Sequence, residues 1–170
     1  MLKQLRSFLL PISATIIIPA IIIWFSDASR IFRIHMVLPV LQAIVGVIFV
    51  VLGLTLLITT IRLFIIVGRG TLAPWDPTKK FVAVGPYRYT RNPMISGVIF
   101  ILIGETIIFG SISLLLWAVT FFIINTIYFI LSEEPGLKKR FGEQYLQYKK
   151  NVPRWLPRLR PWSELGKGDS

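Results

Sequence analysis

Residues 85–94, GPYRYTRNPM, gather side chains that can donate hydrogen bonds and carry positive charge. Gly85-Pro86 and Asn92-Pro93 are turn signals, and a residue that precedes proline is driven towards extended geometry. The segment therefore cannot be one continuous helix, and we expect a rigid loop with free backbone N–H groups. The alternative is that its Tyr and Arg side chains only anchor the chain at a membrane interface.

Residues 132–148, SEEPGLKKRFGEQYLQY, place two adjacent carboxylates, Glu133 and Glu134, ahead of an amphipathic pattern. Consecutive helical residues point about 100° apart, so we expect one glutamate to enter a site while the other pairs with Arg140 or Lys138. A basic helix that lies on the membrane surface is the alternative. The apolar face of the predicted helix is formed by Leu137, Phe141, Tyr145 and Tyr148.

Two further sets of polar residues lie inside apolar stretches, where polar groups are candidates for function. Asn125 and Tyr128 share a stripe that leads towards Glu133, and Asn125 either donates an interhelical hydrogen bond or lines a cavity. Glu105 is expected to be structural, because small residues on its helical face are typical of close helix packing. Its expected neighbours are Gln42, Arg30 or Arg33, and its helical face carries Gly97, Ile101, Gly104 and Ile108.

The elements that must position these residues are membrane helices. The chain has 170 residues, of which 54% are hydrophobic and 16% charged, whereas an average soluble domain has about 25% charged residues. A bilayer core about 30 Å thick needs about 20 helical residues, and four stretches qualify. We therefore predict an all-α integral membrane protein, a single domain over residues 1–170 with a tight hairpin between its third and fourth spans. The predicted parts are spans at 8–25, 38–67, 94–109 and 112–131, a cytoplasmic loop at 68–93 and a cytoplasmic tail at 132–170.

Charge supports this topology and excludes several functions. The N-terminal segment carries two Lys or Arg residues, the loop five and the tail nine, whereas the opposite side has only Arg30 and Arg33. The positive-inside rule then predicts a multi-pass protein with both termini cytoplasmic, and its cations face anionic lipid rather than nucleic acid. The chain has no Cys, and its single histidine is His35, so a metal site, a Cys nucleophile or a Ser-His-Asp triad is not expected. No oligomeric state follows from these features.

The motif G-P-Y-x-x-x-R-N-P-M, with Gly97 three residues later, precedes E-E-x-x-L-x-x-x-F-G-x-x-Y-x-x-Y and V-P-R-x-x-P. Over residues 85–157 this arrangement resembles the isoprenylcysteine carboxyl methyltransferase and phospholipid methyltransferase superfamily. The resemblance implies an integral membrane enzyme that binds S-adenosylmethionine between the loop and the tail. It implies cofactor contacts by Gly85, Pro86, Tyr87, Arg91, Asn92, Pro93, Gly97, Glu133, Glu134, Tyr145 and Tyr148.

The implied catalytic residues are Arg140, Glu133 and Glu134, and Asn125 and Tyr128 are expected to line the substrate. One glutamate would bind the cofactor's ammonium or ribose hydroxyls, while loop N–H groups and Tyr87 hold its carboxylate or adenine. Arg140 would orient an anionic acceptor, whose tail enters from the bilayer between the third and fourth spans.

The acceptor is left open between two chemistries. We expect a lipid or prenylated small molecule, and first a prenylcysteine-type carboxylate that undergoes O-methylation beside Arg140. Related prenylcysteine enzymes typically carry His where this chain has Asn92, a difference that bears on the acceptor. N-methylation of phosphatidylethanolamine is the alternative, and a small lipophilic thiol or alcohol is a third. A sterol-reductase-like nicotinamide enzyme and a non-catalytic lipid-binding protein are the remaining hypotheses.

Overall fold

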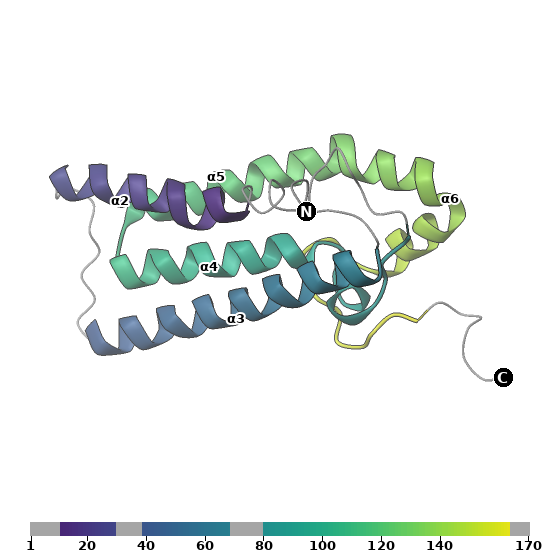
Figure 1. The fold of residues 1–170 in the computed structure, drawn as a ribbon, viewed down its shortest axis with the longest axis horizontal. Helices are drawn as coiled ribbons and strands as arrows, with labels where there is room; N and C mark the ends of the chain where they lie inside the picture. Colours follow the sequence, from purple (N-terminus) through teal and green to yellow (C-terminus); the bar gives the residue numbers. More distant parts are fainter. Residues whose placement is uncertain (1–10, 30–38, 69–79, 164–170) are drawn as a thin grey trace.

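The computed structural model describes residues 11–29, 39–68 and 80–163, and this part of the chain is helical without a strand. Figure 1 shows long helices that run side by side, with shorter segments gathered at one end. The first predicted span begins at residue 8, outside the described residues, which start at residue 11. The third predicted span, 94–109, lies wholly within them. The helices are η1 (Ser13–Ile17), α2 (Ile18–Ser29), α3 (Pro39–Ile66), η2 (Gly85–Arg88), α4 (Pro93–Phe109), α5 (Ile112–Tyr128), η3 (Phe129–Glu133) and α6 (Glu134–Asn151).

Two of these helical runs are long and apolar enough to cross a membrane, namely α3 and the continuous run Ile112–Asn151. Large apolar side chains stay exposed along both, as lipid-facing surfaces do. The apolar helices Ser13–Phe25 and Pro93–Phe109 are shorter, so crossing by all four remains a prediction. Exposed examples on α3 and α5 are Val40, Val47, Val51, Ile58, Leu116, Ile123 and Ile127.

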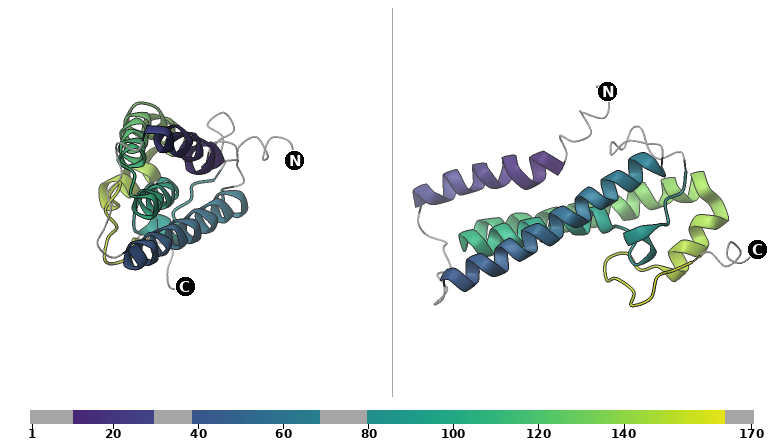
Figure 2. Two further views of the ribbon diagram at one scale, coloured as in Figure 1. Left: turned by 90° about the vertical axis from the view of Figure 1, so that its left-hand side faces the viewer. Right: turned by 60° about the horizontal axis from the view of Figure 1, so that its bottom comes forward.

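Helix α4 is the centre of the bundle, between α3 on one side and α5 with α2 on the other (Figures 1 and 2). Its beginning and end follow from local chemistry. Pro93 supplies a fixed φ at the first helical position, and Gly110, with φ +57°, ends the helix in the left-handed region. Ser111 then caps α5 by accepting a hydrogen bond from the Leu114 N–H, so the predicted tight hairpin is present.

Contact between α3 and α4 depends on paired glycines, as the small-residue face of the third span predicted. A Cβ on Gly53 would lie 2.6 Å from the Gly97 carbonyl oxygen, and one on Gly104 would lie 2.7 Å from the Gly46 oxygen. The backbones can approach this closely only without side chains. The Gln42 amide also donates to the Ile107 carbonyl of α4, which places Gln42 beside the turn of α4 that follows Glu105.

The predicted amphipathic helix forms α6, but it is not straight. Gly142 adopts φ +52° and ψ −127°, which breaks the helical geometry in its middle. The chain reverses there, and a C-terminal strap (residues 152–163) returns along the loop that precedes α4 (Figure 2). The prediction of one regular helix over residues 137–148 is therefore wrong at Gly142, which a sequence pattern read at a constant 3.6-residue period cannot detect.

Candidate functional site

The loop that precedes α4 is held in place by its own turns and by the C-terminal strap. Gly85 has φ +57°, and Pro86 starts the short helix η2. The N–H of Tyr87 donates to the Val84 carbonyl, and those of Tyr89 and Thr90 donate to the Pro86 carbonyl. The expectation that these N–H groups are free for a ligand is therefore wrong. Hydrogen bonds within the turns already occupy these N–H groups, so they are not available to a ligand.

The strap lies antiparallel to the loop and is fixed to it by hydrogen bonds. The Arg91 N–H donates to the Pro153 carbonyl at 2.9 Å, and the Trp162 N–H donates to the Arg88 carbonyl at 2.9 Å. The Thr90 hydroxyl donates to the Arg154 carbonyl at 2.8 Å. Trp162 packs on Tyr148, with ring centroids 5.4 Å apart. These contacts hold the loop backbone against the strap.

Glu134 is the centre of an ion-pair network rather than a free ligand group. Its Oε1 accepts from Arg91 Nη1 and Arg154 Nη2 at 2.7 Å each, and its Oε2 accepts from Lys149 Nζ at 2.7 Å. Burial opposes ionisation, but the hydrogen bonds from Lys149 and Arg154 and the charge of Arg91 outweigh it, so the pKa of Glu134 is lowered. The expected pairing of one glutamate with Arg140 therefore falls on Glu133 and not on Glu134, whose partners come from the loop, from α6 and from the strap.

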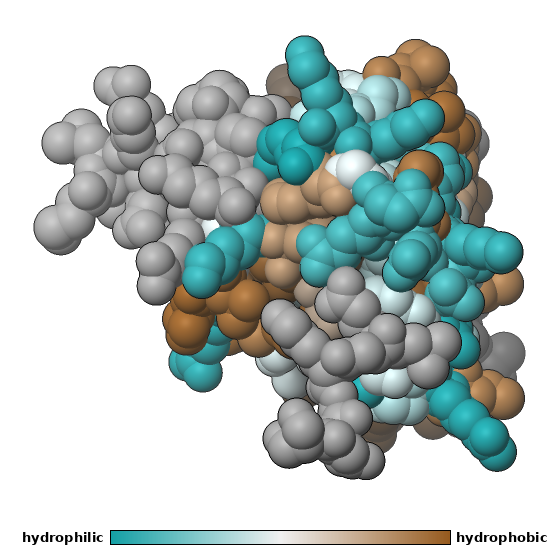
Figure 3. Space-filling model, turned by 90° about the vertical axis from the view of Figure 1, so that its right-hand side faces the viewer, coloured by the Kyte–Doolittle hydropathy of each residue, from teal (hydrophilic) through white to brown (hydrophobic). Residues whose placement is uncertain are grey.

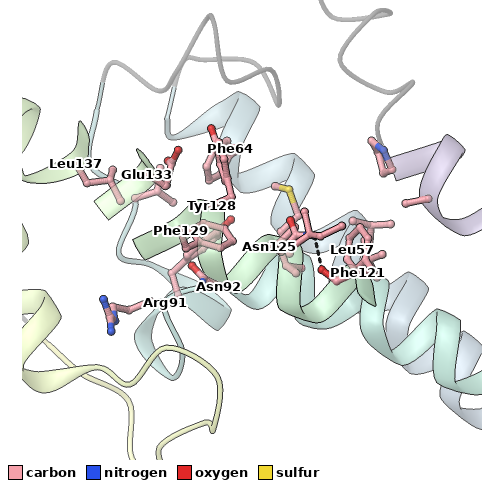
Figure 4. A pocket seen from close by; sticks show the side chains of 18 of the residues that line it. Leu57, Phe64, Arg91, Asn92, Phe121, Asn125, Tyr128, Phe129, Glu133 and Leu137 are labelled. Atoms are coloured by element: carbon pink, nitrogen blue, oxygen red, sulfur yellow. Dashed lines mark hydrogen bonds between the residues drawn. The ribbon is translucent and has the colours of Figure 1, made fainter. Parts of the chain in front are cut away.

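Glu133 lies on the π turn η3 and faces a cavity (Figure 4). Its Oε1 is 3.9 Å from Arg140 Nη2, which is a loose ion pair. Burial raises the pKa of Glu133, and the charge of Arg140 offsets that only in part. Of the two adjacent carboxylates, Glu133 is therefore the one that is available to a bound molecule.

The cavity has a volume of about 440 Å³ and is lined mainly by apolar and aromatic side chains from η1, α3, α4, α5 and the loop (Figure 4). Cavities of this size and composition are typical of small-molecule sites. Most of its polar lining comes from the two sequence motifs and from α5, and Ser13 of η1 is a further polar member. That lining includes Tyr87, Arg91, Asn92, Asn125, Tyr128, Glu133 and Tyr148.

Two hydrogen-bond donors of the lining have no partner among the residues that the structure describes. Asn92 is only 8% exposed, and its Nδ2 makes no hydrogen bond; neither does the buried Nε of Arg91. An unpaired buried donor costs about 1–3 kcal/mol, so native proteins rarely retain one without a use. Both residues line the cavity, and an anionic or carbonyl group of a bound molecule would satisfy them.

The tyrosines of the second motif support the loop from behind. Tyr148 is buried and donates from Oη to the Tyr87 carbonyl at 2.7 Å, and it also lines the cavity. Tyr145 is buried beside it and accepts a long hydrogen bond of 3.4 Å from Arg91 Nη1. Burial raises the pKa of Tyr148 beyond its usual value, so this hydroxyl stays protonated and remains a donor.

The other candidate residues lie near the cavity without lining it. Gly97 packs against Gly53, Pro93 starts α4, and Tyr145 belongs to the cluster beneath the loop. Arg140 points along its own helix, with Nε donating to the Gly136 carbonyl at 3.3 Å. The candidate residues outside the lining are Gly85, Pro86, Pro93, Gly97, Glu134, Arg140 and Tyr145.

The apolar residues that line the cavity were not predicted from the sequence. On α5, Trp117, Phe121 and Ile124 continue the Asn125–Tyr128 stripe towards the N-terminus at helical spacing, so extending that stripe by two turns would have found them. Nothing in the sequence indicated that η1 closes the cavity. There the Trp117 indole N–H donates to the Ala14 carbonyl at 3.1 Å. Missed lining residues from other elements include Ala14, Ile18, Leu57, Phe64, Phe81, Met94, Val98 and Phe129.

A comparison with protein families matches residues 41–144 to the family model described as phospholipid methyltransferase. The match covers α3 from residue 41, the loop, the α4–α5 hairpin and the first part of α6. It therefore includes the whole first motif and the second motif as far as Gln144, and Tyr145 and Tyr148 lie beyond its end. A search of curated proteins gave no significant match.

Proposed function

The chain belongs to the phospholipid methyltransferase family, and from this premise we propose that it transfers a methyl group from S-adenosylmethionine to a lipid-like acceptor in the cavity described above. The observation that carries the proposal is the composition of the cavity lining. Polar groups from both motifs line the cavity together with a larger number of apolar side chains. This composition suits a polar cofactor that meets the head of a molecule with an apolar chain.

The polar residues fit such a cofactor. The unpaired donors of Asn92 and Arg91 suit its carboxylate, and the Glu133 carboxylate suits its ammonium or ribose hydroxyls. Tyr87 and Phe64, whose ring centroids are 5.8 Å apart, provide aromatic surface beside them. When bound, S-adenosylmethionine supplies a methyl group on a sulfonium for in-line displacement, which needs no covalent enzyme intermediate.

The protein's own contribution is positioning and exclusion of water. Glu134 holds the Arg91 guanidinium in place, and Tyr148 holds the loop backbone at Tyr87. Reactants that are fixed in this way avoid much of the entropic cost of meeting. The apolar wall from Ala14 to Trp117 receives the acceptor's chain and keeps water from the reacting groups.

For the acceptor we favour an amine such as the headgroup of phosphatidylethanolamine. A cationic ammonium is favoured near a carboxylate, and Glu133 faces the cavity. Arg140, which a carboxylate acceptor was expected to need, does not line it. Carboxyl O-methylation of a prenylcysteine-type acceptor is the second candidate. The unpaired Nε of Arg91 supports it, because this cation at the cavity wall can orient a carboxylate.

The cofactor is tested by calorimetric titration of the detergent-purified protein with S-adenosylhomocysteine. We expect saturable binding that Glu133→Gln weakens by about tenfold or more, since a charge-assisted hydrogen bond contributes about 1.5–3 kcal/mol. Glu143→Gln, an exposed glutamate on α6, is the matched control and should bind like wild type. Failure of the folded wild-type protein to bind S-adenosylhomocysteine would contradict the proposal. Binding of a nicotinamide cofactor in its place would favour the reductase hypothesis.

The acceptor is tested with tritiated S-adenosylmethionine and the protein in nanodiscs. Two sets of nanodiscs are compared. The first contains phosphatidylethanolamine, and the second contains farnesylcysteine in phosphatidylcholine. We expect base-stable, lipid-extractable tritium with phosphatidylethanolamine. Base-labile tritium, released as methanol only in the farnesylcysteine set, would overturn the amine assignment in favour of the methyl ester.

A further inference from the structure

The C-terminal strap carries an exposed apolar edge that the proposed reaction does not use. Leu156 is 80% exposed and Leu159 is 100% exposed, and both lie within eight residues of chain that hydrogen bonds fix to the loop. The Arg158 N–H, for example, donates to the Tyr89 carbonyl at 3.0 Å, between the two leucines. These leucines are therefore presented outward by a fixed backbone.

The depth of the strap along the bundle follows from Trp155. Its ring lies 5.0 Å from that of Phe122 and 6.2 Å from that of Phe129, measured between centroids. Phe129 and Phe122 lie two and nine residues before Leu131, where the apolar run ends, so at 1.5 Å per residue they lie roughly 3 Å and 14 Å inside that end. Because the Trp155 ring contacts both, the strap lies alongside the last turns of the predicted span, close to the headgroup region, rather than beyond it.

The polar groups of the strap suit the headgroup region of a bilayer. Arg160 is exposed and Arg158 is partly exposed, so lipid can reach both side chains. Three prolines, Pro153, Pro157 and Pro161, remove backbone N–H groups that lipid could not satisfy. Figure 3 shows hydrophilic residues gathered over this end of the molecule with apolar residues at its margins.

We propose that the strap is a lipid-contacting edge, in which Leu156 and Leu159 enter the leaflet beside α5 and the guanidinium groups of Arg158 and Arg160 bind the phosphates of anionic phospholipid. Arginine and tryptophan are both favoured at this depth, where an apolar body and a polar group are needed together. The contact is coupled to the cavity, because Arg154 of the same strap pairs with Glu134, which holds Arg91.

The absence of cysteine from the chain permits a direct test. Leu159→Cys and Glu143→Cys, each labelled with a polarity-sensitive fluorophore, are compared in full-length protein reconstituted into nanodiscs. Both positions are exposed, and Glu143 follows Gly142, at which α6 bends. Figure 1 shows this bend at the end of the molecule opposite the α4–α5 hairpin. Doxyl-labelled phosphatidylcholine should quench the label at position 159 and aqueous iodide the label at position 143. Matched melting temperatures establish that both variants fold.

Anionic lipid is the second arm of the same experiment. Adding phosphatidylglycerol to phosphatidylcholine nanodiscs should increase doxyl quenching at position 159, and Arg160→Gln should reduce that increase. Iodide quenching at position 159 equal to that at position 143 would overturn the lipid contact. Protection from both quenchers would indicate a protein partner and overturn it as well, and insensitivity to phosphatidylglycerol would overturn the role of the arginines. None of these readouts depends on methyl transfer, so the proposed function can fail separately.

Discussion

Glu133 and Glu134 are neighbours in the chain, but their surroundings differ in every respect that matters for function. Glu134 has an 8% exposed side chain with three cationic partners, whereas Glu133 has one loose partner and faces the cavity. Adjacent helical residues diverge by about 100°, so this division of roles is what the local geometry requires. It predicts different consequences for the same chemical change.

Glu134→Gln should reduce stability, because it leaves the buried Arg91 guanidinium without its charge partner. Breaking a buried pair by removing one partner costs about 3 kcal/mol. Thermal unfolding in detergent measures the loss, and Glu133→Gln is the control that should unfold near the wild-type temperature. Equal destabilisation by both changes would contradict the assignment of structure to one glutamate and ligand binding to the other.

The same group predicts a pH dependence. The folded pKa of Glu134 is lowered, so its contribution to stability is complete above the unfolded value of about 4.5 and is lost as the pH falls through the lower, folded value. Wild-type melting temperatures should therefore fall below about pH 4.5 more steeply than those of Glu134→Gln. Parallel curves for the two proteins would show that another group dominates acid unfolding.

Asn92 allows ligand binding to be separated from folding. Its side chain makes no helix-capping hydrogen bond, and its Nδ2 has no partner in the described part of the chain. Asn92→Leu has a similar shape and removes an unsatisfied buried donor, so the melting temperature should be unchanged or higher. Calorimetry with S-adenosylhomocysteine should nevertheless show binding weakened by about tenfold. Unaltered affinity would exclude Asn92 from the cofactor site.

At the residue scale, most of the polar residues that line the cavity were predicted from the sequence. Which of the two glutamates faces the cavity was not. Tyr87, Asn92 and Tyr148 follow from motif and spacing. The choice of Glu133 depends on η3, where a π turn adds a residue to the helical turn and so rotates the faces that follow. Partners such as Arg154 come from the strap, and no local pattern indicates that the strap folds back.

Among the helices, α3 and α4 form the closest pair because glycines face glycines across their contact. Gly97 and Gly104 were recognisable in the sequence as a small-residue face, and the structure supplies their partners, Gly53 and Gly46. The pairs are seven residues apart on each helix, so they recur on the same face after two turns. The pattern predicted close packing but not which helix would meet it.

Gly53→Ala should destabilise the bundle by about 1–3 kcal/mol, the usual cost of overpacking. The added Cβ would meet backbone, 2.6 Å from the Gly97 carbonyl oxygen, and backbone cannot rotate away. Gly136→Ala is the matched control, since no atom of the described residues lies within 4 Å of the added Cβ, and it should be neutral or stabilising. Unfolding of both variants in the same detergent checks this, and equal stability of Gly53→Ala and wild type would argue against a tight α3–α4 contact.

The whole molecule joins residues that are far apart in the chain, and this is where sequence reasoning was weakest. The cavity needs η1, α3, α4 and α5 together, and the hydrogen bond from Trp117 to Ala14 joins residues from opposite halves of the chain. Apolar helices in lipid have no strong preference for one neighbour, so composition predicts spans but not their arrangement. Positions 30–38, which include Arg30 and Arg33, lie outside the described residues, so those expected neighbours of Glu105 stay predictions.

The four-span topology makes a prediction that can be checked in membranes. The α4–α5 hairpin and the bend of α6 should lie on opposite sides of the bilayer. In sealed vesicles, an impermeant maleimide should label Phe109→Cys and Glu143→Cys from opposite sides, and the cysteine-free wild type gives the background. Labelling of both positions from one side would rule out a membrane-crossing hairpin.

The antiparallel seating of the strap on the loop also bears on biosynthesis. Residues 153–162 are translated after every helix that the structure describes, yet they provide the carbonyls and the arginine that fix Arg91, Thr90 and Arg88. A nascent chain that ends at Asn151 would hold all of these described helices, but its loop would lack the strap. Completion of the site is therefore coupled to completion of synthesis, and a premature stop after α6 should yield an inserted but incompetent protein.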